Sequence, residues 1–240
     1  MPNPTAAMLV IGDEILSGRT RDGNTHHLAG RLGDSGIDLR EARTVPDEQP
    51  RIVEALNALR GAYDHVFTSG GIGPTHDDIT ADAVGAAFGV PVDVRDDART
   101  ILAAHYASTG KELNEARLRM ARVPEGATLI DNPVSAAPGF TVGNVHVMAG
   151  VPAIFAAMVE SVLPTLQGGT PPVSASVRVE RGEGDLAGPL GELAARYPDL
   201  SFGSYPFQDA DGRHGANLVV RGADGARVAE AEAALRAAFA

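Results

Sequence analysis

Apolar and polar positions alternate along the first 165 residues with two different periods, which predicts strands and helices in turn. Residues 6–11 form a continuous apolar run, typical of a central strand that is buried on both faces. Further strands are expected at 37–45 and 65–68, and helices at 24–32, 52–59 and 81–88. Because strand and helix alternate, the pattern predicts an α/β fold, a three-layer domain with helices on both faces of a mostly parallel sheet.

The pattern continues to residue 163 and then changes. Helices are expected at 96–106, 113–121 and 153–163, and a hairpin at 141–148 turns around Gly143 and Asn144. Residues 131–140 form a proline-rich loop that is poor in charge, so we expect it to fold against a site or to be a buried connector.

A linker rich in Gly and Pro at 167–172 separates this domain from a shorter segment. The segment has β-runs at 173–179 and 216–220 and helices at 186–197 and 226–239, with a loop expected before the second β-run. We therefore predict a domain at 1–168 and a small two-layer α/β module at 173–240.

Composition narrows the class of protein. The 240 residues carry a net charge of −11, which argues against binding to a nucleic-acid backbone. The chain contains no cysteine, so disulfides, thiolate zinc sites and a cysteine nucleophile are excluded. No apolar run approaches the roughly 20 residues of a membrane helix, and the N-terminus lacks a basic signal region. We expect a cytoplasmic protein without a membrane or nucleic-acid partner.

The most informative stretch is residues 68–80, TSGGIGPTHDDIT, between an expected strand and an expected helix. Its glycines allow a tight turn that exposes backbone N–H groups, and the following helix N-terminus favours an anion such as phosphate. Two adjacent carboxylates beside a phosphate require a metal ion or a proton. The stretch matches neither a Walker loop nor a dinucleotide fingerprint, and an ordinary glycine-rich turn is the alternative interpretation.

Several motifs in this order resemble the molybdenum-cofactor-biosynthesis domain family, also called the molybdopterin-binding domain family. They are residues 11–18 (IGDEILSG), Asn24, residues 70–80, residues 132–139 (NPVSAAPG) and residues 150–152 (GVP). Within the family, the chain most resembles the group of competence/damage-inducible protein A, whose KH-like module is similar to residues 173–240. Ser135-Ala136 replaces the more usual Gly-Thr, and Met148-Ala149 replaces Leu-Pro. The resemblance does not include an amidohydrolase domain, so nicotinamide-nucleotide deamidase activity is not expected.

The resemblance implies roles for three acidic residues. Asp47 and Asp78 match the two acidic positions of the family's adenylyltransferases, so we expect both to be catalytic and to hold a divalent metal, Mg²⁺, Co²⁺ or Ni²⁺. Asp77 is expected as a further metal ligand. Each of Asp47 and Asp78 could instead cap a helix, which Asp does well. His76 could bind metal or transfer protons, or could simply be a surface residue.

A second set of residues is expected to bind the substrate or its phosphate. Those residues are Asp13, Glu14, Ser17, Ser69, Gly70, Gly71, Gly73, Thr75, Pro138 and Gly139. For Asp13 and Glu14 a solvated loop is the alternative. Positive charge for a phosphate could come from Lys111, Arg117, Arg119 or Arg122, although a solvated helix face would also explain these residues.

Three functions are considered, of which the resemblance implies the first and the third. The first is metal-dependent hydrolysis of a nucleotide pyrophosphate such as ADP-ribose, which we favour because the small module marks the corresponding group. The second is non-catalytic binding of a nucleotide or pterin, with molybdopterin as a possible ligand. The third is adenylyl transfer to molybdopterin. Family members assemble as dimers or trimers, so a homo-oligomer is expected.

Overall fold

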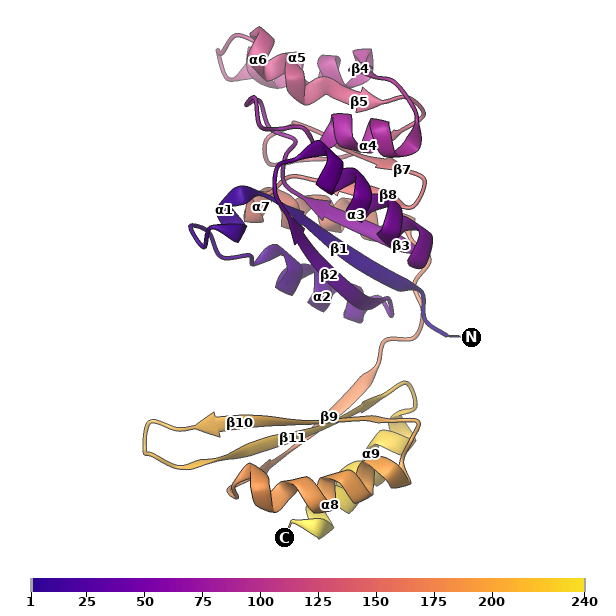
Figure 1. Cartoon of the computed structure of the whole chain (residues 1–240), viewed down its shortest axis with the longest axis vertical. Coiled ribbons are helices and arrows are strands. Elements are labelled where there is room, and N and C mark those ends of the chain that lie inside the picture. The colour runs from indigo at the N-terminus through magenta and orange to yellow at the C-terminus, as the bar shows by residue number, and fades with distance from the viewer. Residues whose placement is uncertain (1, 240) are drawn as a thin grey trace. The chain divides into compact units, whose positions relative to one another are not determined.

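Residues 1–169 contain a six-stranded sheet with the order β2-β1-β3-β8-β7-β6 (Figure 1). The computed structural model describes residues 2–239. The strands are β1 (Thr5–Ile11), β2 (Asp38–Val45), β3 (His65–Ser69), β6 (Thr128–Ile130), β7 (Gly139–Val142) and β8 (Val145–Met148). The first four in the sheet order are parallel, and β7 and β6 are antiparallel to their neighbours. The predicted α/β fold with a mostly parallel sheet is confirmed.

The apolar run in β1 serves two cores. Alternate residues point to opposite faces of a strand. Ala7, Leu9 and Ile11 accordingly join one core cluster. Ala6, Met8 and Val10 join the other cluster. Because both faces of β1 are covered, its sequence is apolar throughout rather than alternating.

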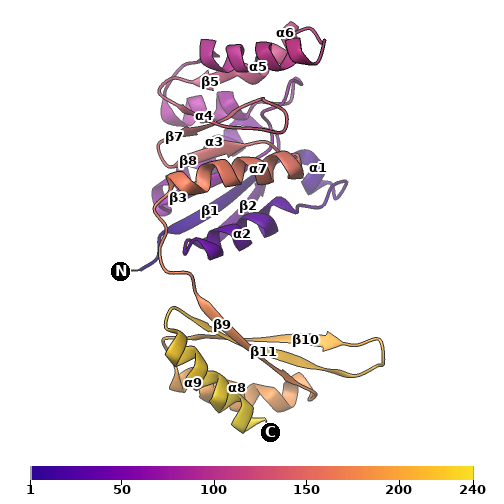
Figure 2. The ribbon, with the colours of Figure 1, turned by 180° about the vertical axis from the view of Figure 1, so that it is seen from behind.

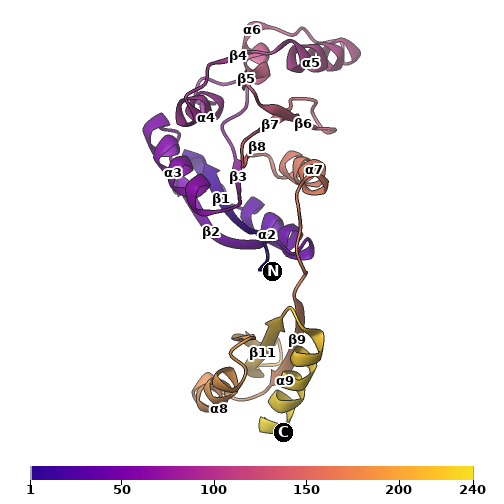
Figure 3. The same ribbon diagram turned by 90° about the vertical axis from the view of Figure 1, so that its right-hand side faces the viewer.

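Helices lie on both faces of this sheet, as the end-on view shows (Figure 3). One face carries α3 (Gln49–Ala62) and α4 (Thr80–Phe88), and the other carries α2 (Asn24–Asp34) and α7 (Pro152–Val162), which are nearest the viewer in Figure 2. A short helix α1 (Asp13–Leu16) follows β1, in place of the solvated loop that was the alternative for Asp13 and Glu14. Its two acidic residues, Asp13 and Glu14, stand in the first turn, where negative charge is favourable.

Beyond α4 the chain forms a small layer that was only partly predicted. It contains α5 (Asp96–Ser108) and a two-stranded ribbon of β4 (Val92–Val94) and β5 (Arg122–Pro124). The helix expected at 113–121 is divided into α6 (Glu115–Leu118) and a 3₁₀ turn, η1 (Arg119–Ala121). Asn114 caps α6 by accepting a hydrogen bond from the Arg117 N–H at 3.0 Å.

The predicted hairpin at 141–148 is confirmed, since Val142 and Val145 face each other across β7 and β8. Gly143 has φ of 55°, which suits the tight turn. The Asn144 amide donates to the carbonyls of Arg60 and Tyr63 at 3.0 and 2.9 Å and so fixes the turn to the end of α3. The 3₁₀ turn η2 (Leu163–Thr165) follows α7.

The second unit, Thr170–Ala240, is a three-stranded antiparallel sheet with the order β10-β11-β9 and two helices on one face. Its elements are β9 (Val173–Val179), α8 (Glu183–Arg196), β10 (Ser201–Gln208), β11 (His214–Gly222) and α9 (Gly225–Ala238). The small C-terminal α/β module is therefore present. Strand β10 replaces the loop expected there, and its Pro206 is tolerated because β10 is an edge strand. No helix among residues 2–239 is long and apolar enough to cross a membrane.

Two neighbouring strands bring two imidazoles together, of which one is buried and the other half-buried. His146 on β8 is 3 % exposed, and its Nε2 lies 3.4 Å from Nδ1 of His65 on β3. The other ring nitrogen of His146 lies 3.0 Å from the Thr141 hydroxyl. Burial, with a smaller contribution from His65, lowers the pKa of His146 to about 4. The imidazole is thus neutral in the folded protein at neutral pH.

We expect His146 to make folding less favourable in mild acid. An unfolded chain binds a proton on this side chain below pH 6.5, whereas the folded chain binds it only near pH 4. Stability therefore falls as the pH drops through that window, by about 3 kcal/mol for this group. Urea unfolding at pH 7 and pH 4.5 measures the loss, and His146→Gln should reduce it. The exposed His76→Gln is the control; an equal pH dependence in all three proteins would refute the assignment.

Candidate functional site

A cleft of about 490 Å³ lies beyond the carboxyl ends of β1, β3 and β8. Glu14 follows β1, Gly71 follows β3 and Gly150 follows β8, and all three line the cleft. In the sheet order, β1 lies between β2 and β3, so the chain passes from β1 to β2 on one side and then returns to place β3 on the other. Such a switch point is where open α/β sheets bind ligands. The volume is within the range of small-molecule pockets.

The glycine loop after β3 is shaped by close backbone contacts. Gly70 has φ of 108°, and a Cβ there would lie 2.2 Å from the Ile11 carbonyl oxygen. Gly71 has φ of 70°, and a Cβ there would lie 2.2 Å from Oγ1 of Thr80. The buried Thr80 hydroxyl in turn donates to the Gly70 carbonyl at 2.9 Å. Only glycine fits these two positions, so the loop brings bare backbone to the edge of the cleft.

Asp78 holds the far end of this loop and lines the cleft. Its Oδ2 accepts hydrogen bonds from the Thr75 N–H at 2.7 Å and from the Thr75 hydroxyl at 2.6 Å. Helix α4 begins at Thr80, its N-cap residue is Ile79, and no side chain caps it. Asp78 therefore does not cap α4, and the alternative interpretation of this residue as a helix cap is wrong. Its carboxylate organises the glycine loop and borders the cleft.

Asp47 lies within electrostatic range of three other acids, Asp13, Glu14 and Asp77. Its Oδ2 accepts the backbone N–H of Asp13 at 3.0 Å, and it does not cap α3, whose start is preceded by Glu48. Burial is the largest cause that raises the pKa of Asp47, and the negative charges of Asp13, Glu14 and Asp77 raise it further. A carboxylate among other carboxylates is a place where a cation would be stabilised.

The Asp77 side chain is more exposed than that of Asp78. His76 Nδ1 lies 3.8 Å from the Asp77 carboxylate, and the His76 side chain is 98 % exposed. This geometry gives His76 the position of a surface residue.

A metal ion needs several ligands within reach of one point. Within residues 2–239 no group of three or more His, Asp or Glu side chains is close enough to form a ready-made metal site. Mg²⁺ is commonly held by one or two carboxylates together with the phosphate oxygens of a substrate. Of the three predicted metal ligands, Asp78 lines the cleft, whereas Asp47 and Asp77 do not.

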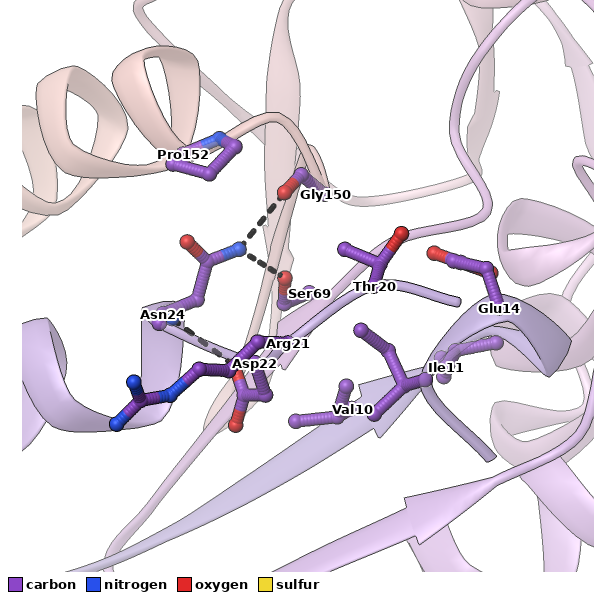
Figure 4. A pocket seen from close by; sticks show the side chains of 12 residues that line it. Val10, Ile11, Glu14, Thr20, Arg21, Asp22, Asn24, Ser69, Gly150 and Pro152 are labelled. Atoms are coloured by element: carbon purple, nitrogen blue, oxygen red, sulfur yellow. Dashed lines mark hydrogen bonds between the residues drawn. The ribbon is translucent and has the colours of Figure 1, made fainter. Parts of the chain in front are cut away.

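Asn24 joins two walls of the site (Figure 4). This side chain is 6 % exposed, and its Nδ2 donates to the Ser69 hydroxyl and to the Gly150 carbonyl, both at 2.8 Å. Ser69 begins the glycine loop and Gly150 precedes α7, so one amide fixes the spacing between them. The three residues border a smaller pocket of about 50 Å³. That pocket shares Glu14, Thr20, Gly150 and Pro152 with the large cleft.

Removing this amide should loosen the site. Asn24→Ala deletes two buried hydrogen bonds and leaves the Gly150 carbonyl with one partner fewer, so we expect the free energy of unfolding to fall by about 2 kcal/mol. Chemical denaturation measures the change. Thr25→Ala is a control on the same helix, because the Thr25 hydroxyl has no hydrogen-bond partner among residues 2–239. Equal stability of Asn24→Ala and the wild type would contradict the role of Asn24 in joining Ser69 to Gly150.

The opposite wall comes from the proline-rich loop. The Asn132 side chain is buried, accepts the N–H groups of Val134 and Ser135 at 3.1 Å, and donates to the Ala137 carbonyl at 2.8 Å. Ala136 is held with φ of 62°, an uncommon conformation for a residue other than glycine. The loop thus has a fixed shape, and three of its residues line the cleft: Asn132, Ser135 and Ala137.

The structure places the predicted site residues in three groups. Glu14, Gly71, Gly73 and Asp78 line the large cleft. Ser69 lines the smaller pocket, and Pro138 lines a side pocket next to Asp78. The remaining residues are outside the lining: Asp13, Ser17, Asp47, Gly70, Thr75, Asp77 and Gly139. Gly139 serves the sheet, since a Cβ there would lie 2.3 Å from the Val147 carbonyl oxygen.

Several lining residues were not predicted from the sequence. They include Thr20, Met120, Asn132 and the segment around the start of α7, where Val151 is 56 % exposed. Motifs of glycine and acidic residues point to binding and catalytic side chains, but they do not reveal the apolar residues that line a cleft. For some of them two signals were available: the low charge of residues 131–140, and the family motifs at 132–139 and 150–152.

Comparison with known proteins places the chain in a family. The family model described as "Probable molybdopterin binding domain" matches residues 7–168, and the model described as "FAD synthase, middle domain" matches residues 171–240. The chain belongs to the molybdopterin-binding domain family, and within it to the CinA-like type.

Three similar proteins illustrate the match. A protein of Pyrobaculum calidifontis is 38 % identical over 215 residues, which is 85 % of this chain and 81 % of the relative. A CinA-like protein of Citrifermentans bemidjiense is 40 % identical over 167 residues, but these make up only 40 % of its length. The crystal structure of CinA from Thermoplasma acidophilum is 30 % identical, with a TM-score of 0.62, and covers 67 % of this chain and 98 % of that one.

Proposed function

We propose that the cleft binds a phosphorylated nucleotide and that the protein hydrolyses a nucleotide pyrophosphate such as ADP-ribose, with the help of a divalent metal. The observation that carries the proposal is the joint presence of Gly71, Gly73 and Asp78 on the wall of one cleft of about 490 Å³. Backbone amides of a glycine loop suit phosphate, and a neighbouring carboxylate is tolerable only with a cation or proton between them.

The residues divide the work between binding and chemistry. Gly71 and Gly73 would hold the phosphates, and the apolar wall of Met120, Ala149 and Ile154 would receive the ring system and exclude water. Asp47 and Asp78 would hold the cation, which when bound supplies Lewis-acid polarisation of phosphoryl oxygens. Hydrolysis of ADP-ribose with one water then gives AMP and ribose 5-phosphate.

A second candidate function is favoured by one finding. Because residues 2–239 contain no ready-made group of three metal-binding side chains, a non-catalytic role that holds a nucleotide or a pterin such as molybdopterin is also consistent with the cleft. Adenylyl transfer to molybdopterin, the other function implied by the family, would use the same phosphate-binding loop. Homo-oligomer formation also remains a proposal.

Binding itself can be tested in the cleft. Calorimetric titration with ADP-ribose in the presence of Mg²⁺ should show saturable binding. Ala137→Trp should abolish this binding, because the larger side chain would fill the cleft. Ala104→Trp, on the exposed face of α5, is the matched control. Unchanged affinity in Ala137→Trp would place the ligand elsewhere. Binding of a pterin but not of ADP-ribose would favour the second function.

A further inference from the structure

Most charged groups around the cleft have the wrong sign for a phosphate. Glu14 and Asp78 line it, and Asp13, Asp47 and Asp77 form the neighbouring acidic group. An anionic ligand entering this field needs compensating positive charge, and a side chain of the protein can add to what the proposed metal supplies. The backbone amides of the glycine loop provide only partial charges.

Two guanidinium groups lie on the other side of the glycine loop. Arg119 and Arg122 line a side pocket together with Gly71, Gly73 and Asp78, residues that also line the main cleft. Arg122 is fully engaged, because its two terminal nitrogens donate to the Asp82 carboxylate at 2.8 and 2.6 Å. Its charge is therefore neutralised within the fold.

Arg119, unlike Arg122, is not paired with an acid among the described residues. Among residues 2–239 it has no carboxylate partner, and its one hydrogen bond is a long contact of 3.3 Å from Nη2 to the Asp78 carbonyl. Its Nε is buried and has no acceptor among the described residues. A buried N–H without an acceptor costs about 1–3 kcal/mol, so its retention beside the glycine loop calls for a reason other than stability.

We propose that Arg119 is the phosphate-selecting residue of the cleft: its uncompensated guanidinium makes the site prefer a ligand that carries phosphate over the same ligand without it. A guanidinium offers several donors in a plane that matches phosphate oxygens. The chemistry it recognises is a phosphate or pyrophosphate group, carried by a nucleotide or by a phosphorylated pterin. The inference rests on the proposed function for the location of the ligand, but not for its hydrolysis.

Inorganic pyrophosphate with Mg²⁺ is the probe that isolates this role. We expect calorimetry to show at least tenfold weaker binding by Arg119→Met than by the wild type, and a partial recovery in Arg119→Lys, which keeps the charge but not the planar fork. The matched control is Arg117→Met, because Arg117 is stacked on Tyr106 and bonded to the Glu112 carbonyl, outside the cleft. Unchanged pyrophosphate affinity in Arg119→Met, or no pyrophosphate binding by the wild type, would overturn the proposal.

Two further readouts separate selection from structural support. The melting temperature of Arg119→Met should be equal to or above that of the wild type, since an unsatisfied donor has been removed. Affinity for ADP should fall while affinity for adenosine stays within about twofold. A lower melting temperature with equal losses for ADP and adenosine would mean that Arg119 only supports the fold. A phosphorylated pterin tested beside ADP shows which ring carries the phosphate.

These results are independent of the hydrolysis test. Arg119-dependent pyrophosphate binding by a protein that leaves ADP-ribose intact would retain this inference and remove the proposed hydrolysis. Turnover of ADP-ribose that is insensitive to Arg119→Met in both KM and kcat would do the reverse.

Discussion

Asp78→Asn is expected to lower kcat/KM for ADP-ribose by about 10²–10³-fold, since it removes a carboxylate charge from the wall where the phosphates and the cation would meet. The fold should survive. Asparagine keeps an oxygen that can accept from the Thr75 N–H and hydroxyl, which are the two contacts that Asp78 makes with the loop. Steady-state kinetics with circular dichroism on the same samples separates the two effects.

The matched control for Asp78→Asn is Asp96→Asn, because the Asp96 side chain is 98 % exposed at the start of α5 and has only a 3.9 Å pairing with Arg99. Its kcat/KM should equal that of the wild type. If Asp78→Asn also keeps full turnover, the carboxylate has no catalytic role and serves only to shape the glycine loop.

Removal of divalent metal is expected to have an equally large effect. Chelation by EDTA should reduce turnover by at least about 100-fold, and Mg²⁺, Co²⁺ or Ni²⁺ should restore it, because the proposed hydrolysis depends on polarisation of phosphoryl oxygens by a divalent metal. Asp47→Asn should raise the metal concentration needed for half-maximal turnover, since it removes a carboxylate from the acidic group.

The chelation experiment also distinguishes the two candidate functions. A binding module would keep most of its affinity for nucleotide or pterin after EDTA treatment, whereas the enzyme would lose its turnover. Turnover that persists in EDTA would contradict a metal-dependent hydrolase. The readouts are AMP formation for catalysis and calorimetry for binding.

The parallel sheet could be predicted because its strand β1 is long and buried on both faces. Residues 6–11 are apolar without interruption, and the two cores on either side of β1 explain why. Shorter or less regular strands were missed. β4, β5 and β6 have three residues each, too few for a period to be recognised. β10 carries Gly203 and Pro206, which are typical of loops but are accepted at a sheet edge.

The glycine loop was equally visible in the sequence, because Gly70 and Gly71 occur together at the end of a strand, and both have positive φ. What sequence could not supply was the direction of individual side chains. The carboxylate of Asp47 turns to the Asp13 N–H rather than to its own helix, and Arg119 differs from Arg122 only through the acid, Asp82, that lies beside the latter. Such pairings depend on tertiary contacts between segments 34 to 41 residues apart.

AMP release from ADP-ribose by the purified protein is the measurement that tests the central claim most directly. Product analysis by chromatography, with Mg²⁺, Co²⁺ or Ni²⁺ in turn, should detect equimolar AMP and ribose 5-phosphate from the wild type and only background from Asp78→Asn. No product from the wild type with any of the three metals would contradict hydrolysis at this cleft and leave ligand binding or adenylyl transfer as its function.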